Sequence, residues 1–262
     1  MGDATQPHIL EKWHGAGNDF LVAVRPSGPA RLDAATAVRW CDRHTGIGAD
    51  GLIEGFFTEA GFSMRLFNAD GSAAELSGNG LRCLVAAAAT HGLVPEGTLD
   101  VATDAGPRRV TVALDPAGAR AWGSVAMGDV EVKGGTLDTG VIALVGNPHV
   151  VVADDAAPDA ALVERARALA GPLASGANVE FVTVVGADHV SIRVVERGAG
   201  LTLACGTGSC AVAAVLHDQG LVGTRVTVTN PGGDLDVTLV DGTATLAGPA
   251  QRVASITLDE IW

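Results

Sequence analysis

A short glycine-rich segment occurs twice in this chain, and this repetition limits the possible folds more than any other feature. Residues Ser77–Cys83 read SGNGLRC, and Cys205–Cys210, about half a chain further on, read CGTGSC. The same offset places Ser63–Phe67 on Ser191–Val195, so a strand-like segment and a glycine loop are both repeated. Since the offset is close to half of the 262 residues, the pattern indicates a duplicated half-chain and not the short period of a solenoid or propeller.

Each glycine loop is followed by a segment that is apolar nearly all round. Leu84–Ala89 and Ala211–Ala214 lie in these segments. A helix without a polar face is expected in a protein interior, so each half should have one buried central helix. We expect these helices at about residues 79–91 and 205–218.

Strand-like patterns make up most of the remaining sequence. They run from Ile9–Trp13 to Leu235–Leu239, which we expect to complete the second half. No Pro/Ser-rich linker marks a boundary, so symmetry alone suggests a division into residues 1–134 and 135–262. The expected class is therefore α+β, with two related halves.

A second glycine motif, residues 46–51, matches the G-x-G-x-x-G pattern of dinucleotide-binding loops. In those loops the motif follows a strand and opens a helix. Here it follows a helix expected at 34–44 and leads into a strand-like segment at Leu52. The context therefore argues against a dinucleotide site.

Composition and charge narrow the class of partner. Hydrophobic residues make up 47% of the chain, yet no apolar stretch approaches the ~20 residues of a membrane helix. The N-terminal residues also lack the basic and apolar regions of a secretory signal. A net charge of −13 disfavours binding to nucleic acid or to anionic lipid. We expect a cytoplasmic protein that acts on a small molecule, with no nucleic acid or membrane partner. Homodimer formation is left open.

The cysteines and lysines limit the cofactors. The four cysteines form no CxxC pair and show no Cys/His spacing of a zinc site, so we expect no metal. The two lysines, Lys12 and Lys133, lie in no context that suggests a Schiff base with pyridoxal phosphate. We therefore expect chemistry without a cofactor.

The two loops suggest a specific chemistry. Backbone amides at a helix N-terminus bind a carboxylate, and glycines let the ligand approach closely. Cys205 stands just before such a helix, where a thiol's pKa is expected to be lowered so that it can act as a base. If the halves face each other, Ser77 and Cys205 lie on opposite sides of a substrate. Proton removal on one side and return on the other would invert a stereocentre.

Six motifs, taken in order and spacing, resemble the signature of the diaminopimelate epimerase family over the whole chain. They are HGAGNDF (14–20), NADGS (68–72), GNGLRC (78–83), GNPH (146–149), ERGAG (196–200) and ACGTG (204–208). The resemblance implies an isomerase of lysine and cell-wall synthesis that interconverts L,L- and meso-diaminopimelate by two-base proton transfer without pyridoxal phosphate. It also implies two pseudo-symmetric halves, each a mostly antiparallel sheet wrapped around a central helix.

Carried over by position, the resemblance implies that Cys205 is one catalytic acid/base. The second catalytic cysteine of the family falls at Ser77, whose hydroxyl is a far weaker acid than a thiol. His149 either tunes an acid/base group or is a structural histidine. The positions that the resemblance assigns to substrate binding are Asn18, Asn68, Gly78, Asn79, Asn147, Asn178, Glu196, Arg197, Gly206 and Thr207. Of these, Gly78, Asn79, Gly206 and Thr207 are implied to hold the reacting carboxylate and Glu196 the distal ammonium group.

Ser77 leaves three interpretations open. The first is an epimerase impaired by replacement of one catalytic cysteine, whether native or engineered. The second is a one-base dehydratase or isomerase on the same scaffold. The third is a protein that binds diaminopimelate without turning it over.

Overall fold

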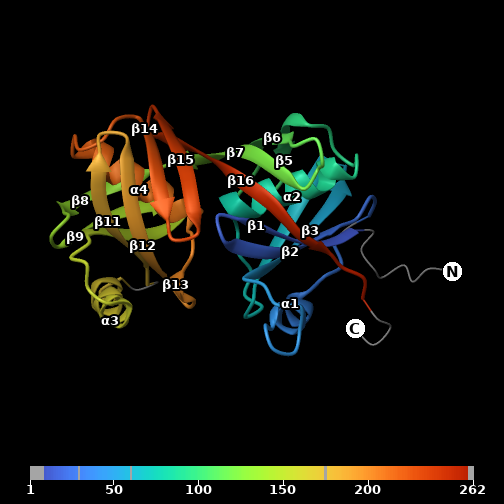
Figure 1. Cartoon of the computed structure of the whole chain (residues 1–262), viewed down its shortest axis with the longest axis horizontal. Helices are drawn as coiled ribbons and strands as arrows, with labels where there is room; N and C mark the ends of the chain where they lie inside the picture. Colours follow the sequence, from blue (N-terminus) through green and yellow to red (C-terminus); the bar gives the residue numbers. More distant parts are fainter. Residues whose placement is uncertain (1–8, 29, 60, 174–175, 259–262) are drawn as a thin grey trace. The chain divides into compact units, whose positions relative to one another are not determined.

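A computed structural model describes residues 9–28, 30–59, 61–173 and 176–258 of the chain. The chain divides into two compact units (Figure 1). The first contains the described residues up to Gly15, residues 19–125 and the described residues from Pro249 onward, and the second contains residues 16–18 and 126–248. The predicted division at 134/135 differs from this one. The units are not consecutive halves, because the C-terminal strand begins in the second unit and ends in the first.

The first unit is a mostly antiparallel sheet with two helices. Its elements are β1 (Ile9–Gly15), β2 (Asn18–Val24), α1 (Ala34–Cys41), β3 (Gly51–Thr58), β4 (Gly61–Asn68), α2 (Gly78–Thr90), β5 (Gly97–Val101), β6 (Arg108–Leu114) and the start of β7 (Arg120–Asp129). Strands β2 and β3 are parallel, whereas the pairs β3/β4, β5/β6 and β6/β7 are antiparallel. The glycine loop at 46–51 follows α1 and leads into β3, which is the context that argued against a dinucleotide site.

Helix α2 is the central helix of this unit. Its residues 78–88 are all buried, and it packs against β1, β3 and β6 (Figure 1). After Thr90 the chain turns at Gly92, whose φ of 68° is accessible to glycine at little cost. The amides of Gly92 and Leu93 donate to the carbonyl oxygens of Ala89 and Ala88, which satisfies the last turn. The predicted helix and its end are confirmed.

The second unit has the same class of fold. Its elements are β8 (Glu131–Thr136), β9 (Gly140–Val145), β10 (Asn147–Ala153), α3 (Asp159–Ala170), β11 (Asn178–Gly186), β12 (His189–Glu196), β13 (Gly200–Thr202), α4 (Gly206–Asp218), β14 (Arg225–Asn230), β15 (Gly233–Val240) and the start of β16 (Thr243–Ser255). The sheet order is β16-β15-β14-β12-β11-β10-β9-β8, with parallel pairing only in β10/β11 and β12/β14 among the pairs described. Helix α4 is buried along nearly its whole length and packs against β8 to β11, β14 and β15.

The repeat seen in the sequence is a repeat of structural elements. The offset that relates Ser77 to Cys205 also carries both ends of α2 onto both ends of α4, and both ends of β4 onto those of β12. Strand β10 follows β2 at nearly the same offset. The expected α+β class, with a duplicated half built around a central helix, is confirmed.

The sequence failed to predict β8, β13 and β16. Strand β16 is the most consequential, because its first part pairs with β15 and its last part with β1. It contains Gly248 and Pro249, which are unfavourable within strands. These residues lie outside the registers paired with β15 and with β1, at 243–247 and 251–255, so the missing N–H of proline interrupts neither of those two ladders. Strand β16 also pairs with β7. The Gly248–Pro249 step therefore argues locally against a strand, although neither the β15 ladder nor the β1 ladder includes it.

Candidate active site

Cys205 is the N-cap residue of α4. Its backbone is extended, with φ −126°, and its Sγ accepts a hydrogen bond from the amide of Gly208 at 3.4 Å. The hydroxyl of Thr207 lies 3.5 Å from the same sulfur. The backbone amide of Cys205 donates to Asn230 Oδ1 at 3.3 Å, so the residue is held on both sides. A thiol here takes the place of the oxygen that normally caps a helix.

Other residues expected at the site gather around this sulfur. Asn178 Nδ2 lies 4.0 Å from Cys205 Sγ, and Asn178 Oδ1 accepts from the amide of Arg197 at 2.9 Å. Glu196 shares a hydrogen bond with Cys205, and its Oε1 accepts from the hydroxyl of Thr202 at 2.6 Å. The ends of β11, β12 and α4 therefore bring the thiol, a carboxylate and an amide together within the second unit.

A buried pair lies beside this group. His149 Nδ1 is 2.7 Å from Glu180 Oε1, and His149 Nε2 is 3.1 Å from Asn147 Oδ1. The side chains of His149 and Glu180 are both fully buried. Glu180 was not among the site residues expected from the sequence. The signal was a carboxylate inside a mostly apolar strand, at a position where the first half has Leu52.

The electrostatics of Cys205 differ from expectation. Its pKa is raised well above 9.0, first by burial and then by the carboxylates of Glu196 and Glu180. Hydrogen bonds from Thr207 and Gly208 oppose this rise. A helix N-terminus favours an anion by only about 0.3–1 kcal/mol at exposed sites, so burial and two carboxylates outweigh it. The predicted lowering of this pKa was wrong.

The pKa of Glu196 is also raised, mainly because its carboxyl group is buried. The charge of Glu180 adds to the rise, whereas His149 and the hydrogen bonds from Thr202 and Cys205 oppose it. Burial therefore raises the pKa of both the thiol and the carboxyl group. A cationic ligand group beside Glu196 would lower the pKa of its carboxyl group again, because an opposite charge favours the ionised carboxylate.

Ser77 is the N-cap residue of α2, in the first unit. Its Oγ accepts from the amide of Gly80 at 3.0 Å, in the same geometry that Cys205 adopts at α4. Asn79, in the first turn, accepts a 2.6 Å hydrogen bond at Oδ1 from the fully buried Arg82. At the end of β4, Asn68 Nδ2 donates to Ser72 Oγ at 2.9 Å.

The residues expected to form the site thus divide between the units. The first unit contains Asn68, Ser77, Gly78 and Asn79. The second contains Asn18, half-buried at the start of β2, together with Asn147, His149, Asn178, Glu196, Arg197, Cys205, Gly206 and Thr207.

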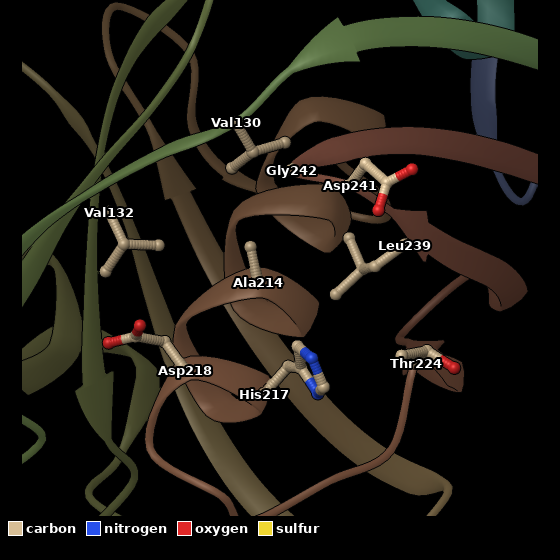
Figure 2. Close-up of a pocket in the computed structure, with 9 residues that line it drawn as sticks. All are labelled: Val130, Val132, Ala214, His217, Asp218, Thr224, Leu239, Asp241 and Gly242. Atoms are coloured by element: carbon tan, nitrogen blue, oxygen red, sulfur yellow. The ribbon is translucent and has the colours of Figure 1, made fainter.

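A cavity of about 310 Å³ lies elsewhere in the second unit (Figure 2). His217 and Asp218, from the last turn of α4, line it together with Val132 and Leu239. Cys205 lies at the opposite end of this 13-residue helix, roughly 20 Å away at 1.5 Å per residue. The cavity is therefore separate from the thiol.

Within the described ranges, no group of three or more His, Cys, Asp or Glu side chains is arranged to hold a metal ion. None of the helices in the part of the chain described here combines the length and apolar character needed to cross a bilayer.

Comparisons with known proteins agree with the geometry. The family model described as diaminopimelate epimerase matches residues 11–133 and 141–253. Diaminopimelate epimerase 1 of Nostoc sp. is 39% identical, over 92% of this chain and 96% of its own length. The diaminopimelate epimerase of Streptomyces coelicolor is 38% identical, over 96% and 95%.

Solved structures support the fold. A protein from Pseudomonas aeruginosa described as a predicted epimerase superposes with a TM-score of 0.74, at 16% identity, covering 95% of this chain and 98% of that one. A hydroxyproline epimerase from Agrobacterium vitis, with bound trans-4-hydroxy-L-proline, gives 0.67 at 18% identity, covering 95% and 91%.

Proposed function

The chain belongs to the diaminopimelate epimerase family, and we propose that it is an epimerase that acts at the α-carbon of diaminopimelate without a cofactor. The curated relatives are named diaminopimelate epimerase and are covered over nearly their whole length. The observation that carries the proposal is the thiol of Cys205 at the start of a buried helix, beside a carboxylate and an asparagine.

Cys205 is proposed to exchange a proton with the substrate α-carbon. A substrate carboxylate accepts hydrogen bonds from the backbone amides of Gly206 and Thr207, which also makes the α-proton more acidic. Removing that proton forms a carbanion, and its charge delocalises into the bound carboxylate. The raised pKa of Cys205 suits the return of a proton to carbon. For proton removal the thiolate must form, so substrate binding must lower the free-energy cost of ionising the thiol.

The remaining positions are proposed to recognise the distal amino-acid end. The guanidinium of Arg197 and the amides of asparagines match its carboxylate, and Glu196 matches its ammonium group. That ammonium group would also lower the cost of charge at Glu196. The asparagines in this proposed role are Asn18, Asn68, Asn147 and Asn178.

Ser77 is proposed to hold the place of the second acid/base at the start of α2. Its hydroxyl accepts from Gly80 as a helix cap does, so the local shape of the loop is kept. A serine hydroxyl does not accumulate as the charged base, however. We therefore expect slow epimerisation with substrate binding retained.

The test is α-proton exchange in deuterated water, followed by NMR on L,L- and meso-diaminopimelate separately. Exchange into one isomer faster than inversion supports a working Cys205 and a slow Ser77. Binding without exchange would contradict the catalytic proposal and favour a binding protein. Loss of water from a hydroxylated amino acid, with no exchange of diaminopimelate, would favour a one-base dehydratase.

A further inference from the structure

Glu180 is a buried charge that the proposed reaction does not yet explain. Its side chain is fully buried on β11, and Oε2 has no hydrogen-bond partner among the described residues. Oε1 is bonded to His149 Nδ1 on the neighbouring strand β10. Burying a carboxylate with a hydrogen bond at only one oxygen costs folding free energy, so packing alone does not explain a glutamate at this position.

Glu180 also contacts the first turn of α4. A Cβ atom added at Gly208 would collide with the Glu180 carboxylate, and the three nearest atoms would all belong to that side chain. The amide of Gly208 donates to Cys205 Sγ. Glu180, Gly208 and the thiol are therefore consecutive contacts, with no room for a side chain between them.

A second chain of contacts leads from Glu180 through His149. The two ring nitrogens of His149 face Glu180 Oε1 and Asn147 Oδ1, at 2.7 and 3.1 Å. The short hydrogen bond to Glu180 fixes the orientation of the ring, and the ring in turn contacts the side-chain amide oxygen of Asn147. Orientation of Asn147 thus depends on a carboxylate two contacts away.

We propose that Glu180 is a positioning residue for the reaction: its carboxylate fixes the His149 ring, and through it Asn147, and places a negative charge beside the Cys205 thiol. The role of Glu180 in turnover rests on the proposed function. Its hold on the His149 ring and its charge beside the thiol exist without substrate. The charged groups acting on the thiol are Glu180 on β11 and Glu196 on β12, with His149 on β10 bonded to Glu180. Removal of the Glu180 carboxylate therefore takes away one of the two negative charges that act on the Cys205 thiol.

Two variants separate the charge from the hydrogen bond. Glu180→Gln removes the charge but keeps an oxygen that can accept from His149. Glu180→Leu removes both and introduces the residue that the first half has at Leu52. Glu164→Gln, on an exposed glutamate of α3, is the matched control.

The first readout is an NMR titration of ¹³Cβ-labelled cysteine, with Cys205 assigned from Cys205→Ser. Both Glu180 variants should lower the Cys205 titration midpoint by about one pH unit or more, because one like charge is removed. Glu164→Gln should leave it unchanged. An unchanged midpoint in Glu180→Gln would overturn the proposal, even if Glu180→Leu failed to fold.

The second readout is the downfield proton signal of the His149 Nδ1–H. It should persist in the parent protein and in Glu180→Gln and disappear in Glu180→Leu. Loss in both variants, or persistence in Glu180→Leu, would overturn the positioning role. Neither readout needs substrate, so absence of α-proton exchange in the parent protein would count against the proposed function alone.

Discussion

The starts of α2 and α4 share a backbone but differ in charge. Ser77 and Cys205 each cap their helix with a side-chain atom that accepts from the amide three residues on. Beside the first lies a buried cation, Arg82, which donates to Asn79. Beside the second lie the carboxylates of Glu180 and Glu196, which raise the pKa of the thiol. Duplication thus preserved the shape of the loop while the two electrostatic environments diverged.

The strands beneath these helices explain the divergence. His149 and Glu180 are equivalent by position to Phe20 and Leu52, both of which are buried and apolar. One half therefore packs hydrophobic side chains where the other holds a hydrogen-bonded histidine–glutamate pair. The second half therefore places ionisable side chains at positions where the first half is apolar.

The largest effect is expected from Cys205→Ala. Loss of one acid/base group should reduce α-proton exchange by roughly 10²- to 10⁴-fold. The measurement is exchange in deuterated water under the conditions used for the parent protein. Cys210→Ala, a change further along the same helix, is the control and should retain exchange. A Cys205→Ala variant as fast as the parent would remove the thiol from the mechanism.

Ser77→Cys should act in the opposite direction. A thiol at the second cap is expected to raise the epimerisation rate by roughly 10²-fold, since it supplies the missing acid/base group. The new thiol should also titrate at lower pH than Cys205, because the buried charged side chain of its own helix is the cation Arg82, whereas the carboxylates of Glu180 and Glu196 act on Cys205. Rate is followed by interconversion of the two isomers, and titration by cysteine NMR. No gain in rate would mean that Ser77 does not occupy a catalytic position.

The paired substitutions Gly208→Ala and Gly80→Ala test the packing beneath each loop. At Gly208 the added methyl group meets the Glu180 carboxylate, which His149 holds in place. At Gly80 it meets the Cδ1 of Ile53 at 2.8 Å, the end of a flexible side chain. We expect Gly208→Ala to lower the free energy of unfolding by about 1–3 kcal/mol and Gly80→Ala by less. Urea denaturation compares them, and equal losses would contradict a rigid Glu180.

The smallest effect concerns pH. A thiol whose pKa is raised in the folded chain stabilises the fold below its unfolded pKa of 9.0. As the pH rises above 9.0, the unfolded chain releases a proton that the folded chain keeps, so this stability declines. Between pH 9 and the folded pKa, the free energy of unfolding should fall by about 1.4 kcal/mol per pH unit more steeply in the parent than in Cys205→Ser. Ser77→Ala should match the parent slope. Equal slopes in the parent and Cys205→Ser would show that the thiol pKa is not raised.

Much of the fold was predictable because its signals are local. The helices after Ser77 and Cys205 follow from glycine loops, apolar periodicity and a glycine at the C-terminal end. Strand β16 was not predictable, since its Gly248–Pro249 step is unfavourable in a strand by itself and lies outside the residues that pair with β15 and with β1. Helix α1 ends at Cys41, earlier than expected, because Asp42 caps the following turn by accepting from the amides of His44 and Thr45.

By itself the sequence determined the duplication, the two central helices, the family and the caps at Ser77 and Cys205, because each rests on neighbours along the chain. Tertiary structure alone decided that β16 joins both units, that Glu180 lies against Gly208, and that the thiol's pKa is raised. These depend on burial and on Coulomb interactions between strands far apart in sequence. A helix dipole can be read from a motif, whereas the carboxylates that outweigh it appear only when β11, β12 and α4 are packed together.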